Sequence, residues 1–298
     1  KTLTPSPLFS TGVLGASLLT LGGTDQQKQT YLPQIVDGTL TTALASEESN
    51  RHAPHSIETV AKKSGDNFII SGTKNFVIDG HSSKLLIVAA RTEGEKNDAS
   101  GITLFLVESD HQDVEITKTS MVDSRNAANI KFNDVAVSSE NIIGEENNGA
   151  SVLEVVLDRA QIAISAEMLG NASQAFDLTL EYLKERKQFG AVIGTFQALQ
   201  HRAAEMYSEL ELTKSSVIAA CNAVDQNSND LRRMASLAKF KSGETNHLIT
   251  NEAIQMHGGV GVTDEYDVGL FMKRARVTEQ IFGNSEYHID RYATLSDY

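Results

Sequence analysis

The chain has few cysteines, which are common in small secreted proteins, and lacks the excess of basic residues that is typical of nucleic-acid-binding proteins. It has one cysteine in 298 residues, which excludes an intrachain disulfide framework. Cys221 has the helical neighbours Val217, Ala220 and Val224, so we expect a buried thiol. Basic residues are outnumbered by acidic ones, 26 to 39, and the net charge of −13 argues against a nucleic-acid or anionic-membrane surface. A local basic cluster such as Lys184, Arg186 and Lys187 still allows an anionic ligand.

Long apolar runs are also missing. No charge-free stretch is long enough to span a bilayer, and the first five residues do not form a signal peptide. We therefore expect a cytoplasmic protein without an integral membrane segment.

Several catalytic patterns are absent as well. No Gly-x-Gly-x-x-Gly follows a strand pattern, so a Rossmann dinucleotide site is not predicted, and no Gly-x-Ser-x-Gly supports hydrolase chemistry. His81, His201, His247 and His257 lack the paired spacing of metal ligands. We expect no metal site.

What is present is a helical pattern, then a β-rich region, then helices again. Residues 8–21 are small and apolar and predict a buried helix, and Thr24 with Gln27 predicts a capping box at the start of a second helix. β-rich runs at residues 68–72, 85–90, 102–107 and 130–137 predict strands separated by Gly, Asn and Asp. This order indicates an α+β protein of separate layers or domains and excludes a doubly wound sheet.

The second half of the chain predicts an antiparallel helical bundle. Apolar residues recur at helical spacing from near Ser151, from about 196 to 224, from 231 to 257 and from about 265 to 282. The first two helices meet at residues 185–190 (Glu-Arg-Lys-Gln-Phe-Gly), where basic residues complement the helix dipole and Gly190 is a plausible stop.

That corner continues with Ile193-Gly194, Phe196-Gln197 and Gln200-His201. Together these residues resemble the connection between two C-terminal-domain helices of the acyl-CoA dehydrogenase family. Four further segments resemble the family in order: 23–33, 44–49, 72–80 and 255–265. The resemblance implies three domains: residues 1–40 as a remnant of the N-terminal helical domain, 41–145 as a middle β-barrel-like domain, and 146–298 as a C-terminal four-helix bundle. More helix precedes this point in the family, so we expect a shortened or fragmentary chain that lacks part of the acyl-chain pocket.

The resemblance also implies FAD and the residues that contact it. They are Ser46, Phe76, Val77, Ile78, Arg186, Gln188, Phe189, Gln255, Gly258, Gly259 and Asn284. Phe76 stands at the usual tryptophan position, and Ile78 replaces a common hydroxyl residue. Structural explanations stay open for several of them: Phe76 as sheet core, Arg186 as a surface salt bridge, and the glycine pair as a helix stop.

The family's usual catalytic base is the glutamate of a C-terminal Tyr-Glu-Gly-Thr motif, and Phe282 occupies that place here. Some members place the base on the first long helix, immediately before an arginine, where this chain has Asp158 and Arg159. Asp158 lies three residues after Val155 and four before Ile162, so it projects from the apolar face, where burial would raise its pKa. Asp158 is therefore our candidate base and Arg159 our candidate substrate contact, although a structural ion pair would explain either residue.

The resemblance thus implies an FAD-dependent acyl-CoA dehydrogenase that converts an acyl-CoA thioester of fatty acid or acyl-CoA degradation to a trans-2-enoyl-CoA. An electron-transferring flavoprotein is the implied electron acceptor, and a homodimer or homotetramer is the implied assembly, with a heteromer possible. The alternative is a non-catalytic subunit that completes a partner's FAD or CoA site. Phe282, Ile78 and Phe76 favour the alternative, and Asp158 speaks against it.

Overall fold

The computed structural model describes residues 2–298, and the chain divides into two compact units. The sheet unit holds residues 5–160, and the helical unit holds residues 161–298 with the first residues of the chain. The division falls inside helix α3 (Gly149–Glu185). The first helices therefore belong to the same compact unit as the sheet, and the three-domain division inferred from the sequence stays a prediction.

The sheet unit begins with the predicted apolar helix. It is a π-helix, η1 (Leu8–Gly15), continued by α1 (Ala16–Gly22). The predicted capping box is confirmed at α2 (Asp25–Val36), where the Thr24 hydroxyl accepts from the Gln27 N–H at 3.2 Å and the Gln27 side chain accepts from the Thr24 N–H at 3.0 Å. The Gln27 amide also donates to the carbonyls of Glu140 and Ile142, so this cap anchors α2 to the end of the sheet.

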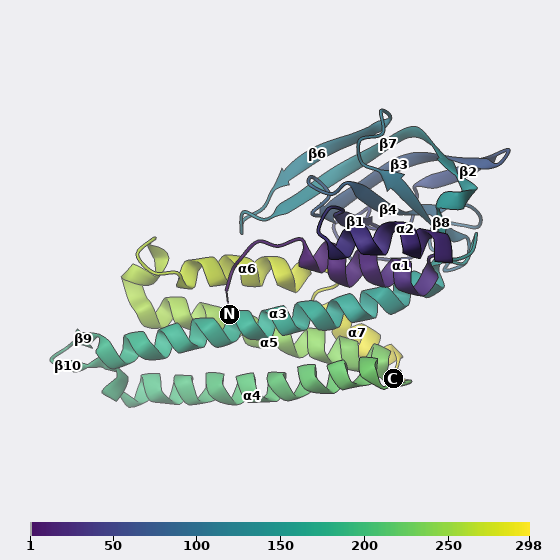
Figure 1. Cartoon of the computed structure of the whole chain (residues 1–298). Coiled ribbons are helices and arrows are strands. Elements are labelled where there is room, and N and C mark those ends of the chain that lie inside the picture. Colours follow the sequence, from purple (N-terminus) through teal and green to yellow (C-terminus); the bar gives the residue numbers. More distant parts are fainter. Residues whose placement is uncertain (1) are drawn as a thin grey trace. The chain divides into compact units, whose positions relative to one another are not determined.

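The sheet has eight strands: β1 (Thr42–Ala45), β2 (Val60–Ser64), β3 (Asn67–Ile78), β4 (Leu85–Arg91), β5 (Ile102–Glu108), β6 (Val114–Ser120), β7 (Asn126–Ser138) and β8 (Ile142–Ile143). Their order is β6-β7-β3-β2-β4-β5-β8, with β1 parallel to β4 (Figure 1). The runs predicted at 68–72, 85–90, 102–107 and 130–137 lie in β3, β4, β5 and β7. β4 is buried along its whole length, which explains its uninterrupted apolar sequence.

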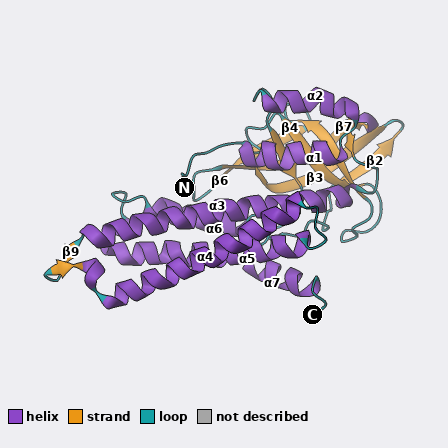
Figure 2. Cartoon of the chain, turned by 60° about the horizontal axis from the view of Figure 1, so that its bottom comes forward, coloured by secondary structure: helices purple, strands orange, loops and turns teal. Residues whose placement is uncertain are grey.

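The helical unit consists of the second part of α3, α4 (Gln197–Asp225), α5 (Leu231–His257), α6 (Val268–Gln280) and α7 (Ser285–Thr294). α4 and α5 pack along each other, as Figures 1 and 2 show. Between α3 and α4 lies a two-stranded hairpin, β9 (Lys187–Gln188) and β10 (Ala191–Val192). The first three predicted helices agree with α3, α4 and α5, the fourth begins at Val268, and α7 was not predicted. No helix within residues 2–298 is long and apolar enough to cross a membrane.

The prediction of a buried Cys221 is wrong, because the thiol is exposed on α4. The buried positions of this helix recur at Met206, Leu210, Thr213, Val217 and Ala220. Cys221 lies one residue, about 100°, beyond this buried stripe. Apolar neighbours at helical spacing located the stripe correctly but not its width.

Candidate functional site

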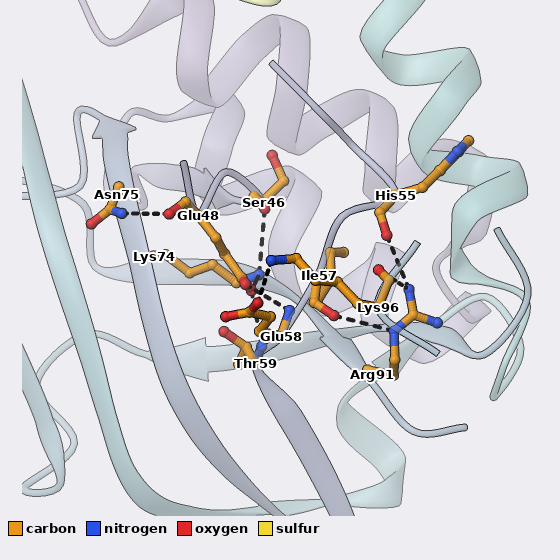
Figure 3. Close-up of polar contacts among 10 residues, drawn as sticks. All are labelled: Ser46, Glu48, His55, Ile57, Glu58, Thr59, Lys74, Asn75, Arg91 and Lys96. Atoms are coloured by element: carbon orange, nitrogen blue, oxygen red, sulfur yellow. Dashed lines mark hydrogen bonds and ion pairs between the residues drawn. The ribbon is translucent and has the colours of Figure 1, made fainter. Parts of the chain in front are cut away.

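The first part of the site is the loop that follows β1. Pairing between β1 and β4 ends at Ala45, so residues 46–49 leave the sheet and need other partners for their backbone. Strand β3 supplies them: the Asn75 N–H donates to the Glu47 carbonyl at 2.8 Å, and the Asn75 amide donates to the Glu48 carbonyl at 2.6 Å. Figure 3 shows Asn75 beside this loop.

A buried ion pair joins the same two segments. The Lys74 ammonium is fully buried and lies 2.6 Å from a Glu48 carboxylate oxygen. The carboxylate also accepts the N–H groups of Glu58 at 2.6 Å and Thr59 at 3.0 Å. Burial alone would raise the pKa of Glu48, but the charge of Lys74 and these hydrogen bonds hold it below its ordinary value. Burial lowers the pKa of Lys74 to about 8, although Glu48 opposes that shift.

Two of the predicted flavin contacts lie on the segments that this network joins. The Ser46 side chain is 2% exposed, and within residues 2–298 its hydroxyl has no hydrogen-bond partner. Phe76 is 37% exposed with φ at 53°. It lies in a β-bulge, because pairing of β3 with β7 shifts register between Lys74 and Val77, and its N–H donates to the Asn129 side chain. Bulges of this kind redirect side chains beside functional sites.

The other two residues of this segment differ in what they can offer a ligand. Val77 is buried in the sheet core, so only its backbone could face a ligand, and Ile78 is half-buried. The explanation of Phe76 as sheet core does not hold, because an aromatic ring that is more than one third exposed is not a core residue.

In the helical unit, the hairpin carries three predicted residues. Phe189 and Gly190 have φ of 57° and 78° and connect the pair Gln188–Ala191, which is the geometry of a two-residue type I′ turn. The predicted stop at Gly190 is therefore part of a hairpin turn, five residues beyond the end of α3. Phe189 is 83% exposed, and Arg186 and Gln188 are exposed as well.

The glycine segment lies at the C-terminal end of α5. Gln255, Gly258 and Gly259 are all exposed, and a Cβ added at either glycine would meet nothing within 4 Å. Gly258 also has φ at 66°, which favours glycine. The backbone is therefore open to close approach by a ligand. Just beyond it, Gly261, Val262 and Leu270 help to line a cavity of about 260 Å³.

The hairpin and the glycine segment are brought together. Tyr182 lies on α3 one turn before Arg186, and its hydroxyl donates to the His257 carbonyl at 3.2 Å. The rings of Tyr182 and His257 stack with centroids 4.3 Å apart. The His257 ring packs against Tyr266 as well. Burial lowers the pKa of His257, so its ring stays neutral near pH 7. This aromatic cluster places both exposed motifs at one end of the helical unit.

Asn284 lies elsewhere. It caps α7, where its side-chain oxygen accepts the Tyr287 N–H at 3.1 Å. The next residue, Ser285, approaches α5 at Gly243, which is 15 residues from Gly258, or about 22 Å along the helix. The structure therefore does not bring Asn284 next to the hairpin and the glycine segment.

The turn that ends in Asn284 also carries Phe282, which is buried with φ at 55°. Its carbonyl lies 3.0 Å from His288 Nε2, and buried Lys239 donates to the carbonyls of Glu279 at 2.9 Å and Gly283 at 2.7 Å. A side chain at Gly283 would collide with Tyr287. This turn is held in a single backbone conformation by side chains of α5 and α7.

Asp158 is 2% exposed on α3, as its helical position predicts. The buried face of α3 is shifted by one residue from the apolar stripe used for this prediction, since Val155 is 37% exposed while Val156 and Leu157 are buried. Arg159 is half-buried, and its Nε has no hydrogen-bond partner within the described residues. Residues 2–298 contain no group of three His, Cys, Asp or Glu side chains that could hold a metal ion.

Sequence reasoning missed the two buried lysines, Lys74 and Lys239. Lys74 stood inside the motif at 72–80, and its even spacing from Phe68 and Ile70 placed it on the buried face of β3, a signal that could have been used. Lys239 gave no comparable signal, because its partners are backbone carbonyls 40 and 44 residues away.

Comparison with known proteins identifies the family. The model of the acyl-CoA dehydrogenase middle domain matches residues 42–135, and the model of the acyl-CoA dehydrogenase C-terminal domain matches residues 147–294. A probable acyl-CoA dehydrogenase of Bacillus subtilis is 34% identical over 277 residues, covering 92% of this chain and 73% of that protein. The chain belongs to the acyl-CoA dehydrogenase family.

Solved structures agree with this assignment. Butyryl-CoA dehydrogenase from Megasphaera elsdenii is 29% identical with a TM-score of 0.93, covering 98% of this chain and 77% of that one. An FAD complex of PigA, 23% identical and covering 98% of this chain and 76% of that one, has the same fold with a TM-score of 0.92. The predicted family, α+β fold and oxidoreductase class are confirmed. FAD, the predicted cofactor, is the group bound in the PigA complex.

Each unit has features that suit FAD. The sheet unit offers a buried hydroxyl at Ser46, which has no hydrogen-bond partner in the described part of the chain, and the partly exposed ring of Phe76. The helical unit offers the guanidinium of Arg186 and an open glycine backbone at Gly258 and Gly259, which together suit a diphosphate.

Proposed function

We propose that this chain catalyses α,β-dehydrogenation of an acyl-CoA thioester, giving a trans-2-enoyl-CoA, with Asp158 as the catalytic base. The observation that carries the proposal is a carboxylate buried on α3 in a chain whose usual base position holds Phe282, a residue that cannot accept a proton. A carboxylate removed from water is a stronger base than an exposed one, which suits proton abstraction near neutral pH.

Asp158 takes the proton from the substrate α-carbon, and Arg159 contributes a cation close to the substrate. FAD, when bound, supplies the acceptor for the hydride that leaves the β-carbon. Ser46, Phe76 and the backbone of Val77 and Ile78 contact the flavin, and Asn284 contributes a further cofactor contact. Arg186, Gln188, Phe189, Gln255, Gly258 and Gly259 hold the diphosphate and the adenosine end.

The exposed position of these last six residues supports an assembly in which they serve the cofactor of another protomer, as a homodimer or homotetramer, or as a heteromer with a related chain. Phe189 in particular exposes most of an aromatic ring at the hairpin tip. Electrons then leave to an electron-transferring flavoprotein.

A second candidate function follows from Phe282. If Asp158 serves only structure, the chain is a non-catalytic subunit that binds FAD or completes a partner's FAD or CoA site. The buried ring of Phe282 at the usual base position is the observation that favours this alternative.

A visible absorption spectrum of the purified protein, followed by anaerobic additions of straight, branched and cyclic acyl-CoA esters, separates the two. Bleaching of the flavin band by one ester supports dehydrogenation and identifies its substrate. Bound flavin that no ester bleaches favours the non-catalytic subunit.

Asp158→Asn tests the base directly. We expect FAD to stay bound while substrate reduces it at least about 100-fold more slowly, the usual range for removal of a general base. Asp177→Asn on the same helix is the control for loss of one carboxylate from α3. Normal reduction in Asp158→Asn, measured by stopped-flow absorbance, would remove Asp158 as the base.

A further inference from the structure

The loop of residues 46–49 depends on strand β3 for its position. Ser46 is the first residue beyond β1, and among residues 2–298 its hydroxyl has no hydrogen-bond partner, so no side-chain hydrogen bond holds it in place. Its carbonyl accepts from the Lys74 ammonium at 3.4 Å, and in Figure 3 the hydroxyl lies on the side away from Lys74. The backbone of Ser46 is thus tethered on one side while its side chain is left available on the other.

Lys74 and Phe76 lie two residues apart on β3, on either side of Asn75. The interactions of Lys74 and Asn75 with the loop therefore fix Ser46 relative to Phe76. The carboxylate of Glu48 extends the connection to the start of β2, because it also accepts the N–H groups of Glu58 and Thr59. One buried ion pair thus joins the end of β1, the approach to β2 and the bulge of β3.

We infer that Lys74 and Glu48 are a positioning pair for the flavin, which holds the Ser46 hydroxyl and the Phe76 ring in the arrangement that FAD binds. The inference rests on the proposed flavin contacts of Ser46 and Phe76. Neither Lys74 nor Glu48 needs to touch the cofactor, since both act by fixing the backbone of residues that do.

The charges around the pair explain how it stays ionised inside the protein. Glu48 and Glu47 favour the charged form of Lys74, and Arg91 opposes it. Glu47 is itself held by the His52 ring, whose Nδ1 lies 2.5 Å from a Glu47 carboxylate oxygen. Arg91 is held by the carbonyls of several loop residues, among them His55, Ile57 and Lys96, as Figure 3 shows. Lys74 is therefore the group of this cluster whose charge changes just above neutral pH.

The inference is separable from a general effect on folding. In Glu48→Gln the amide oxygen can still accept from Lys74 and Thr59, which share one carboxylate oxygen, while the oxygen that accepts from the Glu58 N–H becomes an amide nitrogen. This variant therefore loses the charge of the pair and one hydrogen bond. Lys74→Met removes the ammonium, while the two bonds from Asn75 to the loop stay in place. Lys96→Met is the matched control, because it removes an exposed ion pair with Glu58, the residue whose N–H donates to Glu48.

The experiment measures FAD affinity by flavin fluorescence, with circular dichroism melting of the apoprotein as the check on folding. We expect the dissociation constant for FAD to rise about tenfold or more in Lys74→Met and Glu48→Gln, and to stay within about twofold in Lys96→Met. In the double variant the loss should be no larger than in the worse single variant, because both substitutions break one interaction.

The pH profile adds a readout that a purely structural role would not change. Wild-type affinity for FAD should fall as the pH is raised through about 8, where Lys74 loses its charge, and Lys74→Met should lack this step. The inference is overturned if the Lys74→Met or Glu48→Gln apoprotein is folded and still binds FAD with a dissociation constant within about twofold of the wild type. A wild-type chain that binds no FAD overturns the proposed flavin site itself, which is a different outcome.

Discussion

Replacing Lys239 by methionine should weaken the helical unit more at pH 9 than at pH 7. Lys239 is buried on α5 and donates to the carbonyls of Glu279, in the last turn of α6, and of Gly283. Methionine has a similar length and shape but no donor. One buried and one partly buried carbonyl therefore lose this donor, at a cost of about 1–3 kcal/mol each. At pH 7 part of this cost is offset, because the variant no longer buries an ammonium group.

The size of the pH effect follows from the pKa. Burial lowers the pKa of Lys239 from 10.5 to about 7, with Glu279 opposing the shift. The folded chain therefore releases this proton near pH 7, whereas the unfolded chain keeps it to about pH 10.5. Because the unfolded state binds more protons between these values, the contribution of Lys239 to the free energy of unfolding rises with pH. From pH 7 to pH 9 the increase is about 2 kcal/mol.

Urea unfolding of the apoprotein, followed by circular dichroism at 222 nm, measures the difference between wild type and Lys239→Met at the two pH values. The helical signal reports mainly on the helical unit, which matters because the two units can unfold separately. Lys241→Met is the control for loss of one lysine from α5. It removes a half-buried lysine that pairs with Glu209 of α4. A difference that is the same at pH 7 and pH 9 would show that Lys239 keeps its charge throughout, and would refute this reasoning.

Two further substitutions test the cap of α2 and the glycine segment. Thr24→Ala removes the hydroxyl that accepts the Gln27 N–H and should lower the free energy of unfolding by about 1 kcal/mol, measured by urea unfolding, whereas the exposed Thr30→Ala should change little. Gly259→Asp should weaken FAD binding about tenfold or more, measured by flavin fluorescence, because a carboxylate would oppose a diphosphate. Gly259→Ala, whose Cβ meets nothing within 4 Å, should leave stability unchanged, and equal affinity in the Asp and Ala variants would show that no phosphate approaches this residue.

Local patterns predicted the parts of the structure that local interactions decide. The capping box at Thr24 joins residues three apart, and the apolar run of β4 requires only burial on both faces, so both were visible in the sequence. The burial of Asp158 was predicted from helical spacing even though the stripe was drawn one residue off. The family motifs added the hairpin and glycine segments as functional regions, but not the stacked rings of Tyr182 and His257 that hold them together.

Features set by distant contacts were not predicted. The bond between Lys74 and Glu48 crosses 26 residues, and the choice of Glu48 as partner depends on how β1 and β3 are placed in the sheet. Helix α7 was missed because its sequence is short and mostly polar, with a single fully buried residue, His288, whose ring nitrogens contact the carbonyl of Phe282 and the hydroxyl of Ser236. In each case the folded arrangement decides which partner a buried polar group has, and periodicity can show that a residue is buried but not which partner it meets.

The two buried lysines perform the same task by different means. Lys74 donates to the carbonyl of Ser46, just beyond β1, and Lys239 donates to the carbonyls of Glu279, in the last turn of α6, and of Gly283, where the backbone has no ladder or helix partner. Lys74 also contacts the carboxylate of Glu48 directly. Lys239 donates to the carbonyls of Glu279 and Gly283, and the Glu279 carboxylate acts on its pKa only through its charge. Burial lowers the pKa of both groups, to about 8 for Lys74 and about 7 for Lys239, and at Lys74 the contact ion pair with Glu48 opposes this shift. A neutral amine still has two N–H donors, enough for the two carbonyls at Lys239, so raising the pH should loosen the loop at Ser46 while the turn at Phe282 stays fixed.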